Sequence, residues 1–145
     1  MKNKISLIII LLFSGLCLSQ QKITWNDLSK VNFTDKYFPD YDEYYMYPTF
    51  LSSVKVLAGK QITITGYFLN IAPEENLYIL SKTPMSSCFF CGQGDPNTVI
   101  EVQFKNPPHF KTDAIVSLTG TLTLNRDDVE HFIFILKNSN GQLVN

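Results

Sequence analysis

The sequence predicts an all-β fold, a small and partly open barrel of five strands preceded by a short helical or irregular N-terminal arm. Three observations lead to this prediction. From residue 54 onward the chain alternates apolar and polar residues with a period of two, which is typical of half-buried strands. Turn residues separate five such segments. Two of the longer segments contain an internal glycine, Gly66 and Gly120, where we expect a bulge or a bend.

The five expected strands follow one another along the second half of the chain. β-Branched and aromatic residues dominate these segments, as they do in strands generally. Five strands, two of them bent at glycine, favour a barrel of the OB type. A β-sandwich remains an alternative, because the sequence does not give the order in which the strands pair. The expected strands are 61–69, 77–80, 98–104, 114–124 and 131–136.

The chain divides into three predicted parts. Residues 1–19 are a signal peptide, residues 20–53 are an aromatic arm and residues 54–145 are the OB-like barrel domain. The 126 residues left after removal of the first part are enough for one domain.

The first 19 residues have the three regions of an export signal. Lys2 and Lys4 precede an apolar run over 5–12, and small residues follow it. Cleavage between Ser19 and Gln20 fits this pattern, and Gln20 then becomes the N-terminus. The apolar run is shorter than the roughly 20 residues that span a bilayer, and no later segment is a candidate span. We therefore expect an exported protein, periplasmic or secreted.

A lipoprotein is the less favoured alternative. Lipid would be attached to Cys17, but Leu16 stands before it where that processing requires a small residue.

Loss of the signal peptide removes two of the 12 basic residues and none of the 13 acidic ones, which leaves a net charge of −3. A weakly acidic chain lacks the basic surface that phosphate backbones require, so nucleic acid is not an expected partner.

The aromatic arm interleaves rings with acids over residues 35–48. Such a strip could bind a carbohydrate or a cation. The interpretation that we favour is that the rings pack the arm onto the barrel while the acids face water, since Tyr and Phe dominate packing of this kind.

Several stretches resemble a family of uncharacterised exported proteins from Bacteroidota. The resemblance rests on residues 57–69, residues 78–81, the Ser-Cys-Phe-Phe-Cys-Gly segment over 87–92, Asp95-Pro96 and the closing strands, and it covers nearly the whole chain after the signal peptide. The chain is also distantly similar to a broader set of periplasmic proteins classed only as a domain of unknown function. In that set the loop holds a Cys followed by His and prolines. The resemblance implies export and a compact β domain, and it transfers no activity; a link of the broader set to metal transport is an association only.

The Cys-x-x-Cys loop over residues 85–96 is the main candidate for chemistry, and a structural disulfide is its favoured interpretation. Cys88 and Cys91 are the two cysteines left after cleavage, and exported proteins meet an oxidising compartment. In the chain-entropy model a bridge across so short a loop stabilises the fold by about 2 kcal/mol.

A soft-metal site is the second interpretation of this loop. Met85, Cys88 and Cys91 recur every three residues, so a tight turn could bring one thioether and two thiolates together. Such ligands select Cu(I) or Zn. A closed zinc site needs four ligands, and His109 or His131 could complete it, although neither is near the loop in sequence.

A redox-active dithiol is the third and least favoured interpretation. Enzymes that use Cys-x-x-Cys in this way place it at a helix N-terminus, where the backbone stabilises a thiolate. Gly92, Gly94 and Pro96 directly follow Cys91 and prevent such a helix.

No catalytic constellation is found elsewhere. The serines lack a nucleophile elbow, the acidic segment 127–130 lacks the pattern of a calcium loop, and no two carboxylates are placed across a cleft. We therefore expect a non-enzymatic envelope module that binds an envelope protein or a metal ion. The alternatives are a thiol-disulfide oxidoreductase and a purely structural interaction domain.

Intact-mass measurement of the protein isolated from its native envelope without reductant tests these expectations. We expect a chain that starts at Gln20 and is two hydrogens lighter than the reduced form, because Cys88 and Cys91 are joined. Free thiols together with a bound metal ion would contradict the disulfide, and a lipid adduct on Cys17 would contradict the cleavage site.

Overall fold

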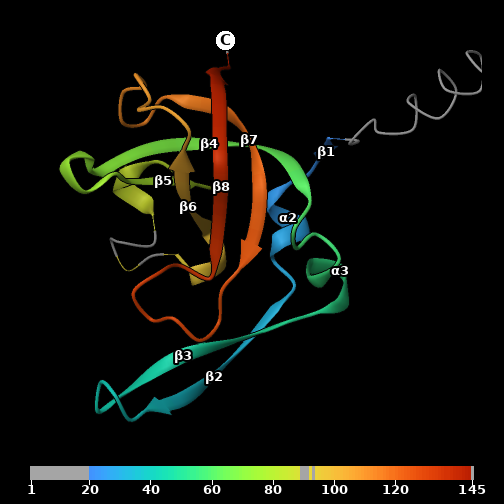
Figure 1. Ribbon diagram of the computed structural model, residues 1–145, viewed down its shortest axis with the longest axis vertical. Coiled ribbons are helices and arrows are strands. Elements are labelled where there is room, and N and C mark those ends of the chain that lie inside the picture. Colours follow the sequence, from blue (N-terminus) through green and yellow to red (C-terminus); the bar gives the residue numbers. More distant parts are fainter. Residues whose placement is uncertain (1–19, 89–91, 93, 145) are drawn as a thin grey trace, which may run out of the picture.

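A closed barrel of five strands dominates the computed structural model, which describes residues 20–88, 92 and 94–144 (Figure 1). The strands pair in the order β4–β5–β6–β8–β7, and β7 pairs in turn with β4. All of these pairs are antiparallel except β6–β8, which is parallel. The predicted all-β fold is confirmed, and closure of the ladder excludes the sandwich. The strands are β4 (Gln61–Ala72), β5 (Leu77–Ser81), β6 (Val99–Phe104), β7 (Ile115–Leu124) and β8 (Phe134–Leu143).

Strand β4 closes the barrel because it pairs with two other barrel strands, in addition to the short β1. Its first part pairs with β7 as far as Tyr67, and from Tyr67 onward it pairs with β5. Gly66 lies at this change of partner. A Cβ atom at Gly66 would lie 2.6 Å from the backbone oxygen of Ser81 and 3.0 Å from the ring of Trp25. Only glycine fits such a close approach. The bulge expected at Gly120 is also present, as a register shift between β7 and β8.

The barrel interior is filled by apolar side chains from every strand. Phe68 is fully buried, and its ring lies 5.9 Å from that of Tyr78 and 5.5 Å from that of Phe110. The N-terminal arm contributes Leu28 and Phe50 to the same cluster, so arm and barrel share one core. The largest fully buried side chains of this cluster are Leu28, Ile62, Ile64, Phe68, Leu80, Ile100, Leu118, Leu122, Phe134 and Leu136.

Most of the N-terminal arm is a β-hairpin, where an irregular or helical segment was expected. The hairpin projects from one end of the barrel (Figure 1). Its two strands pair along their whole length, and Asp42 in the turn takes the left-handed backbone conformation, with φ of 51°. The sequence did not predict these strands, because aromatic side chains occur on both of their faces and apolar and polar residues do not alternate. The arm consists of β1 (Gln21–Lys22), α2 (Trp25–Leu28), β2 (Val31–Phe38), β3 (Glu43–Phe50) and α3 (Ser52–Lys55).

The expectation that the rings of the arm pack onto the barrel holds only at the base of the hairpin. Phe50 is 5% exposed, and its ring lies 5.7 Å from that of Phe134. Toward the turn, Tyr44 is 68% exposed and Met46 is 53% exposed. The outer half of the hairpin is too far from the core to bury its rings there, so the expectation is wrong for that half.

The last strand differs from the predicted 131–136. Strand β8 begins at Phe134 and continues to Leu143. His131 therefore lies in the loop between β7 and β8 and does not open a strand. The second half of β8 has the composition of a turn, and Asn138 has φ of 53°, yet it pairs with β7 as far as Leu143. Pairing with β7 and β6 overrides the local preference of these residues.

Three single turns of 3-10 helix complete the described elements, η1 (Pro73–Glu75), η2 (Met85–Ser87) and η4 (Pro96–Thr98). No helix within the described residues has the length and apolar character needed to cross a membrane. The predicted signal peptide and its cleavage after Ser19 lie outside the described residues and stay predictions.

The close approach at Gly66 gives a stability prediction. Gly66→Ala forces the backbone of β5 or the ring of Trp25 to move, because the added methyl group overlaps both. We expect a loss of about 1–3 kcal/mol in the free energy of unfolding, as for other overpacked sites. Urea unfolding followed by tryptophan fluorescence measures it. Gln61→Ala, at an exposed position of the same strand, is the control and should change this free energy by less than about 0.5 kcal/mol.

Candidate functional site

The site begins with a carboxylate buried on the outer face of the barrel. Glu101 lies in β6 and is only 5% exposed. Its neighbours across the sheet are Ile79 of β5 and Ile135 of β8. Burying a carboxylate among apolar side chains is costly unless hydrogen bonds compensate it. Its surroundings must therefore supply donors.

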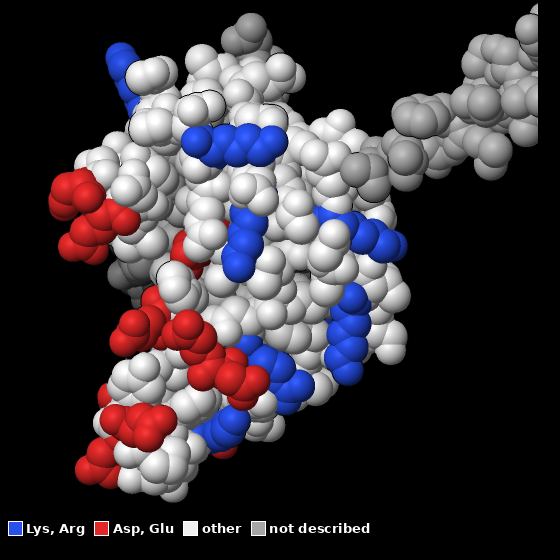
Figure 2. All heavy atoms as spheres, in the orientation of Figure 1, with Lys and Arg blue, Asp and Glu red and all other residues white. Residues whose placement is uncertain are grey.

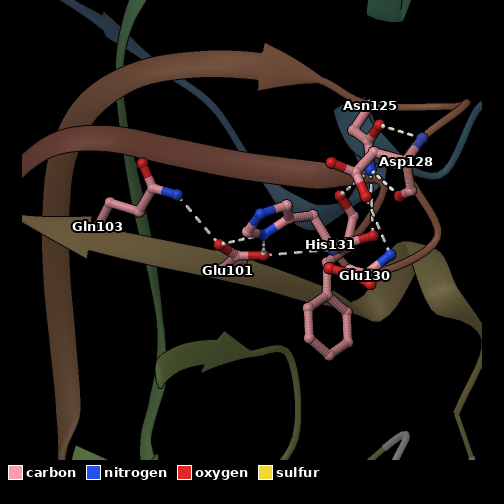
Figure 3. A network of polar contacts seen from close by, with 7 residues as sticks. Glu101, Gln103, Asn125, Asp128, Glu130 and His131 are labelled. Atoms are coloured by element: carbon pink, nitrogen blue, oxygen red, sulfur yellow. Dashed lines mark hydrogen bonds and ion pairs between the residues drawn. The ribbon is translucent and has the colours of Figure 1, made fainter. Parts of the chain in front are cut away.

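Donors reach Glu101 from its own strand and from the loop between β7 and β8 (Figure 3). The side-chain amide of Gln103 donates to Oε1 at 3.1 Å, and the backbone N–H of Phe132 donates to Oε2 at 3.3 Å. His131 Nδ1 lies 3.0 Å from Oε1 and 2.9 Å from Oε2. The loop is thus tied to the barrel wall through one carboxylate.

The contact with Glu101 favours the charged form of His131. The hydrogen bond that His131 donates to the Glu101 carboxylate raises the pKa of His131 above its ordinary value of 6.5, and the negative charges of Glu101, Asp128 and Glu130 add to the rise. Burial of the ring acts in the opposite direction. Because the ring remains 46% exposed, solvent screens part of this effect.

Asn125 organises the same loop from its other end. Its Nδ2 donates to the backbone oxygens of Asp128 at 2.7 Å, His131 at 3.1 Å and Phe132 at 3.3 Å. Its Oδ1 accepts from the N–H of Asp128 at 3.2 Å, and its own N–H donates to the oxygen of Ile133 at 2.9 Å. One side chain therefore fixes the path of the loop over residues 125–133.

The hairpin is attached to this loop by a small polar cluster. Lys36 of β2 lies 3.2 Å from Asp127, and the hydroxyl of Tyr47 in β3 donates to the same oxygen at 3.0 Å. Arg126 Nε donates to the Tyr47 hydroxyl at 2.7 Å. Both cations also lie over the Tyr47 ring, at 4.0 Å for Lys36 and 4.7 Å for Arg126. Hydrogen bonds from Lys36 and Tyr47 lower the pKa of Asp127 and keep it charged.

A groove of about 380 Å³ lies between the hairpin and the loop. Tyr45 and Met46 of β3 form one wall, and the loop over 125–133 forms the other. Pro96, which follows the Cys-x-x-Cys segment, lines it as well. The Tyr45 ring is held edge-on against Phe38, with the ring centres 5.7 Å apart. The groove is thus walled largely by aromatic and aliphatic side chains, which is the usual character of a ligand site.

Acidic side chains surround the groove. Figure 2 shows them gathered over the hairpin and the adjoining loop. Asp128 and Glu130 line the groove itself, and no described lysine or arginine pairs with either. Partial desolvation and the negative charges of Glu130 and Asp128 raise the pKa of Tyr41, which lies in the hairpin turn. The rim of the groove is therefore negative.

The first part of the cysteine loop packs beside the site. Cys88 is fully buried in an apolar cluster with Leu69, Ile79 and Val99, on the outer face of β4, β5 and β6. Met85 and Phe132 pack against this cluster. The segment is also held by Asp113, whose carboxylate accepts from the Met85 N–H at 2.7 Å. Because Phe132 belongs to the groove loop, the cysteine segment and the groove share one cluster.

The structure brings together only part of the predicted metal and disulfide residues. Met85 and Cys88 share the apolar cluster, whereas Cys91 lies outside the described residues, so the pair that the sequence predicts is not tested. His131 faces Glu101, and His109 lines a separate hollow beside Phe104. Among the described residues no three His, Cys, Asp or Glu side chains form a group that could hold a metal ion.

Glu101, Asn125 and the groove were missed by the sequence analysis. The available signal was a single acid inside the apolar segment 98–102, which marks either an exposed position or a buried and partnered one. Apart from Gln103, its partners His131 and Phe132 are 30 and 31 residues away in sequence, so the local sequence does not distinguish these two cases.

Comparisons with known proteins support the fold. The chain is similar to the crystal structure of a DUF3299 family protein from Pseudomonas aeruginosa PAO1, with a TM-score of 0.56 and 12% sequence identity. The match covers 88% of this chain and 97% of that one. No family model matches the sequence, and no curated protein matches it. This similarity is consistent with a domain of unknown function. At 12% identity it shows the fold alone.

We expect the contact between His131 and Glu101 to stabilise the fold most at acidic pH. Because Glu101 raises the pKa of His131, the folded chain holds the proton more tightly than the unfolded chain. The stabilisation is complete below the unfolded pKa near 6.5 and is lost as pH rises through the higher folded pKa. Urea unfolding from about pH 5 to about pH 9 should show the difference between wild type and His131→Gln shrinking as pH rises. His109→Gln is the matched control, and a difference for His131→Gln that is constant with pH would contradict the expectation.

Proposed function

We propose that the chain is a non-enzymatic binding module whose partner is a basic polypeptide segment, docked in the groove between the hairpin and the β7–β8 loop. The observation that carries this proposal is the combination of an apolar groove with an acidic rim. Lysine and arginine side chains suit such a site, because their aliphatic stems cover apolar surface while their charged ends reach the carboxylates.

The charges near the groove divide into two sets. Lys36 and Arg126 both pair with Asp127, which leaves one positive charge in this set, and the three side chains hold the hairpin to the loop. Asp128 and Glu130 remain for a ligand, and the hairpin turn and its flank add Asp40, Asp42 and Glu43. This excess negative charge attracts a basic partner and repels an acidic one, so it supports specificity as well as association rate.

The walls of the groove are fixed before a partner arrives. The Asn125 hydrogen bonds and the buried Glu101 carboxylate hold the loop, and the rings around Tyr45 hold the hairpin wall. A preformed groove loses little conformational freedom on binding, which favours affinity. The position supports a binding role for this loop, because OB folds bind oligonucleotides and oligosaccharides with the loop between their last two strands and the adjacent sheet face.

We also propose that the chain is exported and that Cys88 and Cys91 form a structural disulfide. The complete burial of Cys88 in an apolar cluster supports a structural role, since reactive cysteines are partly exposed in electropositive surroundings. A disulfide there would fix the segment that leads to Pro96 at the groove. A soft-metal site with Met85, Cys88 and Cys91 as ligands of Zn or Cu(I) is the alternative role for this loop.

Binding of a blocked tetrapeptide of alternating lysine and leucine tests the groove. We expect its addition to shift the NMR signals of residues in the 125–133 loop and of Tyr45, because these residues line the groove. The affinity should fall with rising salt, since exposed charges are screened. The corresponding glutamate–leucine peptide should not bind.

A charge-matched pair of variants makes the test specific. Asp128→Asn with Glu130→Gln removes two charges from the groove, and we expect the lysine peptide to bind about tenfold more weakly, which corresponds to about 1.4 kcal/mol. Glu74→Gln with Glu75→Gln removes two charges from η1, outside the groove, and serves as control. Equal weakening in both double variants, or signal shifts that avoid the groove, would rule the groove out as the binding site.

A further inference from the structure

Strand β2 forms an edge that no described strand covers. The hairpin is a separate two-stranded sheet, and β3 is the only described partner of β2. Residues 34–37 of β2 are all exposed, and Figure 1 shows the hairpin extending beyond the barrel. An isolated two-stranded sheet is only marginally stable, and an open edge is a template for a further strand.

The hydrogen-bond pattern identifies which backbone groups the edge offers. Leu51 N–H donates to the oxygen of Lys30 at 3.0 Å, which makes these two residues a hydrogen-bonded pair in the antiparallel register. Such pairs alternate with pairs whose N–H and C=O groups point away from the partner strand. Phe33, Asp35 and Tyr37 therefore direct their backbone groups to the outer edge of β2.

The opposite edge of the hairpin is less suited to a new strand. Pro48 of β3 pairs with Phe33, and it occupies the position whose N–H would point outward. Proline at such a place protects an edge, because it has no N–H to offer. Met46, which also belongs to β3, already lines the groove. The free edge is thus β2.

Apolar side chains accompany this edge on one face of the hairpin. Tyr37 is 43% exposed and Tyr44 is 68% exposed, and their rings lie 5.2 Å apart across the two strands. Met46, on the same face, is 53% exposed. At the base of the hairpin this face enters the core through Val31 and Phe50. A third strand added to β2 would extend this face and cover part of the Tyr37 ring.

We propose that the outer edge of β2 accepts an extended segment of a basic partner polypeptide as a third strand. We infer a basic partner from the charge of the hairpin. The hairpin carries Asp35, Asp40, Asp42 and Glu43 against a single Lys36. A second copy of the chain would bring the same acidic edge against itself, and symmetric antiparallel pairing would set Asp35 opposite Asp35. Like charges directly opposite each other are destabilising. No residue of β2 lines the groove, so the backbone edge of β2 does not depend on ligand binding there, although Met46 of β3 borders both surfaces.

Hydrogen exchange measured residue by residue by NMR reports the added strand directly. The probe is a blocked octapeptide of alternating lysine and valine, added to the protein lacking residues 1–19. We expect slower exchange at the N–H groups of Phe33, Asp35 and Tyr37, and little change at Thr34 and Lys36, which already bond to β3. The same peptide N-methylated at every residue, which has no N–H group on either edge, should give no protection, and neither should a glutamate–valine peptide.

Two variants separate strand addition from other binding. Asp35→Lys reverses the charge of the edge and should weaken the lysine–valine peptide at least tenfold, while Glu74→Lys at η1 makes the same charge change elsewhere and should not. Asp35→Pro removes one outward N–H and should abolish protection at Phe33 and Tyr37. The proposal is overturned if N-methylation leaves binding unchanged, if protection is found only at groove residues, or if the protein alone protects the edge by forming dimers.

Discussion

The whole architecture depends on the bend in β4, which allows one strand to pair with β7 over its first part and with β5 over its second. Gly66 makes the bend possible, because the backbone of β5 and the ring of Trp25 approach it so closely that a side chain does not fit. Trp25 also donates a hydrogen bond to the backbone oxygen of Thr65, so α2 is positioned by the same bend. Closure of the barrel and the attachment of the N-terminal arm therefore have a common origin.

A second constraint places the groove. Glu101 faces outward from β6, yet it is covered, so its charge must be balanced by neighbours. The donors come from Gln103 on the same strand and from the β7–β8 loop, where Phe132 also packs into the cluster around Cys88. The loop is thus held at two points, one polar and one apolar. The hairpin is then attached to the loop through Asp127, and the groove is the space left between them.

The barrel strands were predictable from sequence because their β-branched residues alternate between a buried and an exposed face, and β4 to β7 begin within one residue of the expected positions. Strand β8 and the hairpin were not. The end of β8 has turn-forming residues whose conformation is set by pairing on both sides, and the hairpin carries rings on both faces.

The candidate site could not be predicted from the sequence, for a different reason. It joins three distant segments, which carry Tyr45, the pair Pro96 and Glu101, and His131, and a single acid in an apolar strand does not reveal its partners. The cysteine loop, by contrast, was found by its spacing, although Cys91 lies outside the described residues.

The position of β8 has a consequence for how the chain acquires its structure during synthesis. This strand is the last in sequence, yet it lies between β6 and β7 and supplies Phe134 and Leu136 to the core. Until residues 134–143 have been synthesised, β6 and β7 keep open edges and the interior has no wall on that side. Early local pairings such as the β2–β3 hairpin can form first, but cooperative closure awaits β8. A chain that stops before β8 leaves the edges of β6 and β7 unpaired, and open strand edges of this kind promote aggregation.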